Sequence, residues 1–441
     1  MPAAPSPAMP APGPHKKPSN QGLWYGWVVL AVVFVVMSTI IGIRNSLGFF
    51  FKTISGEFGW SRAETAGAYS IGMVVQAVCS PLFGALGERW SLRWMVAGGV
   101  FLAGTAFLMG PFLGGLFSFY LMYALLNVGF AASTFIPQVQ ILSHWFVRRR
   151  GLAMGFSNAG QGFAAVLNLA VPGLLALAGW RYGYLALALF TLLLVFPLAA
   201  LLLRDHPCQK GTWADAPFLS EGELRAAANE GDRACRGGDP APADGSCRRR
   251  LLSPRFALIG ATYSAIGFII TSTTVHIVPH ATDQGLSPAA SGLIFLLFGL
   301  GMFGCNLLSG VSDTLGRGKT YTLGALLGAA AGLLLAFFTP GVASAWFYLG
   351  ATLAGAGLGL MRPTASALLA DQFAGPGLGK LNGLALTIFA LCGALGAYLT
   401  GLLFDTTGSY RIAFLTLAAI HLAGAVAALR LSAMGRPPQG Y

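Results

Sequence analysis

Charged residues are scarce in this sequence. Only 10% of its 441 residues are Asp, Glu, Lys or Arg, whereas 55% are hydrophobic. A soluble globular protein draws about a quarter of its residues from the charged types, so this composition excludes an ordinary soluble protein. The mean hydropathy of +0.68 indicates a polytopic membrane protein instead.

Metal-binding and catalytic patterns are also missing. The six cysteines follow no common zinc-binding spacing, and Cys79, Cys305 and Cys392 fall inside apolar runs. No nucleophile, base and orienting residue fall at a common depth in those runs. We therefore expect no metal, no cofactor and no enzymatic activity.

Long apolar runs, in contrast, are abundant. Twelve of them, mostly 18 to 28 residues long, can each cross a hydrocarbon core of about 30 Å as a helix. Open sheets are excluded in that core because their unpaired backbone groups would find no water. The sequence therefore predicts an all-α membrane protein with twelve transmembrane helices at 24–51, 66–87, 94–113, 117–143, 151–178, 182–203, 256–281, 288–311, 320–339, 344–370, 378–404 and 410–431.

One connection divides these spans into six and six. Residues 204–255 hold most of the chain's soluble charge, and they include the segment GGDPAPADG. The first 22 residues contain seven prolines and no apolar run, which is typical of a disordered segment. We therefore expect a disordered cytoplasmic tail (1–22), an N-terminal six-helix half (23–203), a cytoplasmic linker (204–255), a C-terminal six-helix half (256–432) and a cytoplasmic tail (433–441).

The two sets of six spans repeat one another. Residues 56–67 are similar to 282–292, and residues 84–93 match 309–319 at nearly the same shift. This pattern indicates an internal duplication of six spans. Parallel halves of this kind place a substrate site near the bilayer midplane and work by rocking against each other.

The basic residues predict the orientation of the chain. With the N-terminus inside, 21 of the 27 Lys and Arg residues fall in cytoplasmic segments, four fall outside and two lie within spans. By the positive-inside rule, both termini are cytoplasmic, and we expect a multi-pass protein of the cell (inner) membrane. Contact with anionic lipid explains the net charge of +12. We expect no nucleic-acid partner and a monomer.

The loops after the second and eighth spans, GALGERWSLR (84–93) and SGVSDTLGRGK (309–319), resemble the signature loop of the major facilitator superfamily. The segment WFVRRRGLAMGFSNAGQG (145–162) resembles the start of the fifth helix in monocarboxylate transporters and their bacterial oxalate/formate antiporter relatives. Residues 22–29 and 46–54 resemble their first helix. The resemblance implies the major facilitator fold and secondary transport by alternating access.

These loops predict an inner gate. Glu88 and Asp313 occupy the acidic position of the signature, although the first copy lacks the glycine before its last basic residue. A carboxylate at an inner helix end can pair with cationic groups in one conformation and release them in the other. The alternative is that these charges only set the topology. The candidate gate residues are Glu88, Arg89, Arg93, Asp313 and Arg317.

Two arginines, Arg44 and Arg362, lie well inside predicted spans. A charge at that depth costs at least about 2.5–3.5 kcal/mol, so it usually faces a water-filled pathway or a protein interior. We predict that both bind an anionic substrate. Alternatively, Arg44 reaches outward along its long stem, and Arg362 bonds backbone carbonyls freed by Pro363.

The sequence departs from the family at two places. The resemblance implies a buried arginine on the eighth helix and a central lysine on the eleventh, and the corresponding spans here have neither. In monocarboxylate transporters, a lysine of the first helix stands at or beside the position of Arg44. The identity of the substrate therefore cannot be transferred residue by residue.

Polar residues in central spans complete the candidate site. Each of them is otherwise explained as an interhelical hydrogen bond. Tyr123 and Asn127 share one face of the fourth span, and the resemblance implies that this helix lines the cavity. The candidate substrate-binding residues are Arg44, Arg362, Tyr123, Asn127, Gln161 and Asn306.

Proton coupling has weaker support, because no Asp or Glu lies deep in any span. His276 and His280 fall one turn apart on the seventh span near Asp283, and histidine titrates in a useful range. They could carry a proton, shape the outer gate or be simple interfacial residues. Alternatively, the substrate carries part of the proton, or one anion exchanges for another.

The sequence thus predicts a secondary active transporter of small organic anions, foremost monocarboxylates, with proton symport or anion exchange. The nearest alternative is an exporter of drugs or larger amphiphilic compounds, for which charge at the two arginines would matter little. An alternative of another class is a carboxylate-binding membrane sensor that signals through residues 204–255.

Overall fold

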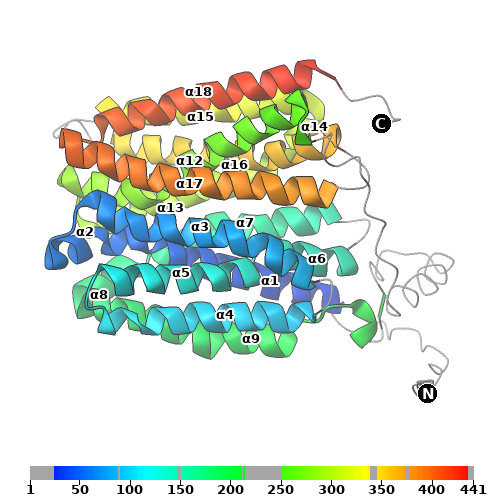
Figure 1. Ribbon diagram of the computed structural model, residues 1–441, viewed down its shortest axis with the longest axis horizontal. Coiled ribbons are helices and arrows are strands. Elements are labelled where there is room, and N and C mark those ends of the chain that lie inside the picture. The colour runs from blue at the N-terminus through cyan, green and yellow to red at the C-terminus, as the bar shows by residue number, and fades with distance from the viewer. Residues whose placement is uncertain are drawn as a thin grey trace.

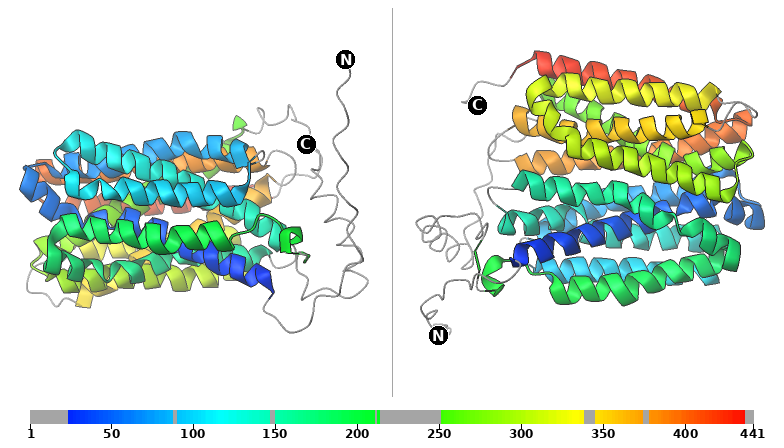
Figure 2. Two further views of the ribbon diagram at one scale, coloured as in Figure 1. Left: turned by 90° about the horizontal axis from the view of Figure 1, so that it is seen from below. Right: turned by 180° about the vertical axis from the view of Figure 1, so that it is seen from behind.

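The structure is a computed structural model that describes residues 24–87, 90–146, 150–210, 212–213, 251–337, 345–373 and 378–435. All regular elements within these ranges are helical, and the long helices run side by side along one axis (Figures 1 and 2). The all-α membrane fold predicted from the sequence is confirmed.

The helices form two groups, which lie one above the other in Figure 1. The first group is α1 (Tyr25–Asn45), α2 (Leu47–Phe58), α3 (Arg62–Gly87), α4 (Leu92–Leu108), α5 (Leu116–Ser133), α6 (Phe135–Trp145), α7 (Arg150–Asn168), α8 (Val171–Phe190) and α9 (Phe196–Leu202). The second group is α12 (Pro254–Asp283), α13 (Pro288–Leu307), α14 (Ser312–Leu315), α15 (Arg317–Phe337), α16 (Ala345–Gln372), α17 (Leu378–Thr407) and α18 (Arg411–Ala433).

Ten helical segments of the described chain are long and apolar enough to cross a membrane. Two further long helices, α7 and α16, are not among them. These two carry several polar residues, including Asn158 and Gln161 on α7 and Arg362 on α16. Both pack against other helices of the bundle, so their polar side chains do not have to face lipid.

The first and fourth predicted spans each contain a break, and a turn lies between the fifth and the sixth. The first is divided at Ser46 between α1 and α2, and the fourth at Thr134 between α5 and α6. Within α8, Gly179 has a φ of 77°, a left-handed conformation that glycine adopts without steric cost. The turn at Gly179 separates the fifth predicted span from the sixth.

The two groups meet along two long helix pairs, α3 with α17 and α7 with α13. Small residues permit the second contact: a Cβ atom on Gly162 would lie 2.6 Å from the carbonyl oxygen of Gly299. Such close backbone approach is the usual way in which membrane helices pack. The limits of the two halves and of the linker stay a prediction, since residues 214–250 lie outside the described part.

The two ends of the bundle differ in what they carry. One end, here named the terminal end, holds the beginning of α1 and the end of α18. The other, named the opposite end, holds the end of α2 and the beginning of α3. Large apolar side chains such as Val78, Phe117 and Leu177 are exposed on the bundle, as expected for helices that face lipid tails.

Candidate anion site and polar latch

A small cavity lies between the two groups of helices. Its volume is about 30 Å³, which is room for roughly two or three water molecules. Arg44 of α1 and Arg362 of α16 both line it. The structure therefore brings the two arginines found in the sequence to one space.

The cavity has aromatic and aliphatic walls with a few polar groups. None of the residues that line it is acidic, so the two guanidinium groups have no carboxylate opposite them there. The lining consists of Ile41, Arg44, Asn45, Tyr69, Met73, Gln76, Phe135, Gln161, Ala165, Ile270, Thr271, Thr274, Phe295, Phe298, Gly299, Met302, Arg362 and Phe389.

Arg44 is held on one side only. Its Nη1 donates a hydrogen bond to Oε1 of Gln76 at 2.9 Å, and its Cζ lies 3.9 Å from the centroid of the Phe130 ring. Its Nε is buried and has no hydrogen-bond partner among the described residues. The amide and the ring thus fix the guanidinium group while they leave donors unused.

Arg362 has fewer partners still. Its Cζ lies 4.6 Å from the ring centroid of Phe135 and 5.4 Å from that of Phe389. Within the described part of the chain, its guanidinium group forms no hydrogen bond and no ion pair, and in particular it bonds no backbone carbonyl. Since a guanidinium group has five N–H donors, this arginine presents an almost unused set of donors to the cavity.

The break in the fourth span brings Phe135 to Arg362. Pro137 has no N–H with which to bond the carbonyl of Ser133, so the helix cannot continue normally through Thr134. The Nε2 of Gln138 donates to that carbonyl instead, at 2.8 Å. Irregular backbone at membrane depth is tolerated where such side-chain bonds satisfy it and where it lines a cavity.

A second cavity, of about 20 Å³, adjoins the first and shares Gln76, Phe135, Arg362 and Phe389 with it. Residues that only the second cavity touches, such as Ser80 of α3 and Leu386 of α17, lie nearer the terminal end of their helices. The two cavities therefore form a series that leads from the arginines toward the terminal end.

The other residues predicted to bind the substrate are distributed differently. Gln161 lines the first cavity, where its Nε2 donates to Oδ1 of Asn158 at 3.2 Å. Tyr123 and Asn127 are buried within the first group, and Asn306 lies near the end of α13. None of these three lines either cavity.

The contacts of Tyr123 and Asn127 explain this difference. The hydroxyl groups of Tyr123 and Tyr184 lie 3.4 Å apart, and Nδ2 of Asn127 donates to the backbone carbonyl of Tyr123 at 2.8 Å. Helical spacing shows that two residues share a face, but not which neighbour that face meets. Here the shared face meets other helices of the same group.

Sequence reasoning missed Tyr69 and Gln76, which line the first cavity from α3. Neither is charged, and both lie within one predicted apolar span, 66–87. The only available signal was that an amide inside such a span needs a hydrogen-bond partner.

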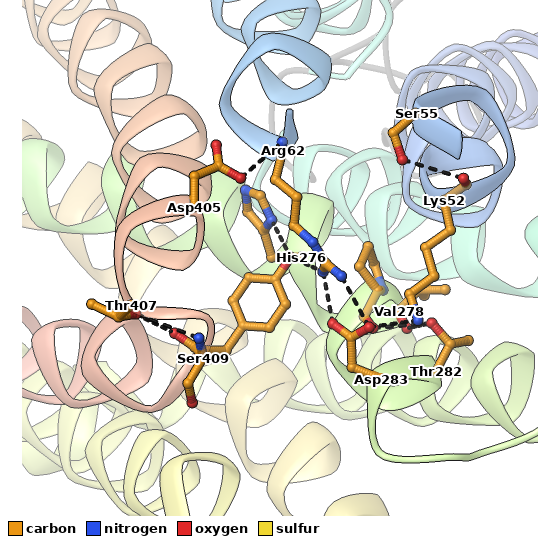
Figure 3. A network of polar contacts seen from close by, with 12 residues as sticks. Lys52, Ser55, Arg62, His276, Val278, Thr282, Asp283, Asp405, Thr407 and Ser409 are labelled. Atoms are coloured by element: carbon orange, nitrogen blue, oxygen red, sulfur yellow. Dashed lines mark hydrogen bonds and ion pairs between the residues drawn. The ribbon is translucent and has the colours of Figure 1, made fainter. Parts of the chain in front are cut away.

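At the opposite end, a network of side chains joins the two groups (Figure 3). Arg62 forms ion pairs with Asp283, with N–O distances of 2.7 and 2.9 Å, and it donates to the hydroxyl of Tyr410 at 2.7 Å. Lys52 also pairs with Asp283, at 2.6 Å. We name this network the polar latch; it consists of Lys52, Arg62, His276, Asp283, Asp405 and Tyr410.

Asp405 completes the connection between α3 and α17. Its carboxylate accepts hydrogen bonds from the backbone N–H groups of Arg62 and Ala63, at 3.0 and 2.8 Å. A carboxylate at the first turn of a helix satisfies donors that have no partner within the helix. All hydrogen bonds and ion pairs between described residues of the two groups lie in the half of the bundle nearer the opposite end.

His276 belongs to the latch and not to the cavity. Its Nδ1 lies 3.0 Å from the Tyr410 hydroxyl, and its Nε2 lies 2.9 Å from the carbonyl oxygen of Ala397 on α17. His280, one turn further along α12, has its Nε2 3.0 Å from the carbonyl oxygen of Leu335. Both rings are buried.

The predicted inner gate is described only in part. Glu88, Arg89 and the side chain of Asp313 lie outside the described residues. The guanidinium group of Arg93 donates to the carbonyl of Ala200.

Among the described residues, the partners of Arg93 and Arg317 lie on the same side of the interface as the arginines themselves. The backbone N–H of Arg93 donates to Asp205 at 2.6 Å; Ala200 lies in α9 of the first group, and Asp205 follows that helix in the chain. Arg317 donates to Asp371 of α16 at 3.2 Å, within the second group. These contacts stabilise each group separately, and a gate across the groups stays a prediction.

Comparison with known proteins identifies the family. The family model of the Major Facilitator Superfamily matches residues 28–311 and 257–440. The fold is also that of a solved structure, a bacterial homolog of the human lysosomal transporter Spinster, with a TM-score of 0.69 at 14% sequence identity over 95% of this chain and 100% of that one. The chain therefore belongs to the Major Facilitator Superfamily of membrane transporters.

Within the superfamily, its relatives are monocarboxylate transporters. Human monocarboxylate transporter 11 is 32% identical over 410 residues, which cover 91% of this chain and 81% of the relative. Monocarboxylate transporter 13 of Rattus norvegicus is 29% identical over 428 residues, which cover 93% and 89%. This similarity places the chain in the monocarboxylate transporter family, as predicted from the sequence.

Proposed function

We propose that this protein is a secondary active transporter of small organic anions, foremost monocarboxylates. The observation that carries the proposal is that Arg44 and Arg362 line one cavity that contains no acidic side chain. An uncompensated charge in a protein interior is costly, and a bound carboxylate would supply the missing negative charge.

The chemistry of the cavity suits a carboxylate. A guanidinium group can donate two parallel hydrogen bonds to the two oxygens of a carboxylate, and Arg362 has its donors available. Gln76 and Phe130 hold Arg44 in place, so its guanidinium group is already oriented before an anion arrives. The aromatic walls would contact a short hydrocarbon body.

The polar latch supports an alternating-access mechanism. It holds the opposite end together, while the second cavity extends from the arginines toward the terminal end. We propose, from the distribution of basic residues, that the terminal end is cytoplasmic and that the protein lies in the cell membrane. In that orientation this conformation is closed to the outside.

Uptake into proteoliposomes tests the proposal. Labelled lactate, pyruvate, formate, oxalate and acetate are offered with and without an inward proton gradient to the native protein and to the variants Arg44→Gln and Arg362→Gln. We expect saturable uptake that both substitutions abolish, and the response to the gradient distinguishes symport from exchange. No uptake of any acid by well-folded protein would overturn the proposal.

A further inference from the structure

We infer that Nδ1 of His276 is a proton-binding site, and that a proton bound there opens the polar latch. The site lies at the opposite end of the bundle, away from the arginine cavity. Its role in a transport cycle rests on the proposed function, whereas proton binding and latch opening do not.

The hydrogen bonds around His276 specify its protonation state. The carbonyl oxygen of Ala397 can only accept, so Nε2 of His276 must carry a hydrogen atom. In a neutral imidazole the other nitrogen is then an acceptor. Nδ1 therefore accepts a hydrogen bond from the Tyr410 hydroxyl, which lies 3.0 Å away.

The same reasoning extends to Arg62. Its Nη1 is a donor and lies 2.7 Å from the Tyr410 oxygen. The chain of bonds thus runs from Arg62 to Tyr410, from Tyr410 to His276 and from His276 to Ala397, with one donor and one acceptor at each step. This complete arrangement exists only while His276 is neutral.

A second proton on His276 breaks the arrangement. Nδ1 becomes a donor, so the Tyr410 oxygen faces donors from both His276 and Arg62, and the Tyr410 hydrogen loses its acceptor. The new charge also adds to that of Arg62, which contacts the same hydroxyl. Closed latch and protonated His276 are therefore incompatible.

The other groups around His276 do not compensate this charge. Asp283 already pairs with Arg62 and with Lys52 of α2, and Asp405 of α17 accepts from the backbone at the start of α3. The remaining neighbours are the ring of Phe51 on α2 and the ring of Tyr410, and His280 on the same helix bonds Leu335 of α15. No carboxylate of the described residues contacts the imidazole.

Proton binding at His276 and closure of the latch therefore oppose each other. The open latch binds the proton more tightly than the closed latch, so acid on that side stabilises the open state and neutral pH favours closure. The proton is released to the same side before the latch closes. His276 then acts as a pH-sensitive gate and does not carry a proton across the membrane.

A cysteine in place of Ser70 reports latch opening. Ser70 is 9% exposed and donates to the carbonyl of Ala394 across the contact between α3 and α17. Labelling of Ser70→Cys by a membrane-impermeant maleimide is measured in proteoliposomes from about pH 7.5 to about pH 5.5, the range in which histidine ordinarily titrates. Labelling of protein without this substitution is subtracted as background from the native cysteines.

The decisive comparison is between His276→Gln and His280→Gln, each combined with Ser70→Cys. Glutamine can still donate to Ala397 and accept from Tyr410, but it cannot take up the proton. The ratio of labelling rates between two backgrounds at one pH cancels the pH dependence of the thiol reaction.

We express each labelling rate as a ratio to that of the His276→Gln background at the same pH. We expect acid to raise this ratio several-fold, with a limit of about tenfold per pH unit for one proton, in both the native and the His280→Gln backgrounds. A ratio that does not change with pH would overturn the inference. If His276→Gln does not fold, Tyr410→Phe serves instead, since it removes the hydroxyl between Arg62 and His276 and should also abolish the response. Because the readout is labelling, it stands even if no organic acid is transported.

Discussion

Two arginine sites at the contact between the helix groups differ in how well the positive charge is matched by partners. Arg62, in the polar latch, contacts both oxygens of Asp283, the Tyr410 hydroxyl and the face of the Phe404 ring. Arg362, in the central cavity, contacts only two aromatic rings within the described part of the chain. The protein itself satisfies the hydrogen-bond donors of Arg62, whereas the donors of Arg362 are available to a ligand.

This difference shows how the partners of a charged residue inside a membrane protein indicate its role. A cation whose partners lie on the other helix group holds the two groups together and must lose those partners when the groups separate. A cation without partners stabilises nothing in the empty protein and therefore points to a ligand. The following predictions test this distinction.

The largest effect is expected for Arg362→Gln. Removal of one partner of a buried charge pair costs about 2–5 kcal/mol, so kcat/KM for the transported anion should fall by about 30-fold to 4,000-fold. The thermal stability of the empty protein should not fall, because the lost charge has no partner there. Both are measured on purified protein, the first in proteoliposomes.

The exposed Arg430 at the end of α18 supplies the matched control. Arg430→Gln should leave both transport and stability unchanged. A clear loss of stability in Arg362→Gln would contradict the comparison, since it would mean that the protein itself satisfies this arginine.

A smaller effect is expected when the cavity is given its own carboxylate. Gln76→Glu would pair Arg44 within the protein and compete with the substrate, so KM should rise about 10- to 100-fold. Gln76→Leu removes the hydrogen bond to Arg44 without adding charge and should raise KM less. Equal effects of the two substitutions on KM would show that loss of the native amide, and not the added negative charge, raises KM.

In the latch, Arg62 and Asp283 should be coupled by about 1 kcal/mol. A double-mutant cycle with Arg62→Gln and Asp283→Asn, followed by thermal unfolding in detergent, measures this term. The double variant should be destabilised by about 1 kcal/mol less than the sum of the two single substitutions. Additive effects would mean that the ion pair contributes nothing to closure.

The smallest effect is expected for Lys52→Gln. The Lys52 side chain is 38% exposed, and ion pairs at such positions contribute about 0.2–1 kcal/mol and weaken with salt. Opening of the latch, measured by labelling of Ser70→Cys, should therefore rise at most about fivefold at low salt and less at high salt. A larger rise would place Lys52 beside Arg62 as a principal latch residue.

Much of the fold followed from local properties of the chain. The division of the fifth span from the sixth at Gly179, the long apolar helices and the intramembrane positions of Arg44 and Arg362 are all readable from composition and spacing. The candidate site was only partly readable. Arg44, Arg362 and Gln161 line the cavity, whereas Tyr123, Asn127 and Asn306 do not.

The polar latch could not be predicted from the sequence. Its members come from α2, α3, α12, α17 and the start of α18, and the separate positions of Arg62, Asp283 and Asp405 in short loops or at helix ends suggest only ordinary interfacial charges. His276 could be identified as titratable, but not as the acceptor of a hydrogen bond from Tyr410.

The sequence by itself determined that the chain is a bundle of membrane helices with two cations at depth, because apolar length and the cost of a charge at depth are properties of single segments. Only the tertiary structure decided that Arg44 and Arg362 share a cavity, that Arg62 is paired and Arg362 is not, and that His276 bonds the Tyr410 hydroxyl that Arg62 also contacts. These facts depend on which helix faces meet, and the packing of small residues at contacts such as Gly162 with Gly299 sets those faces across long stretches of chain.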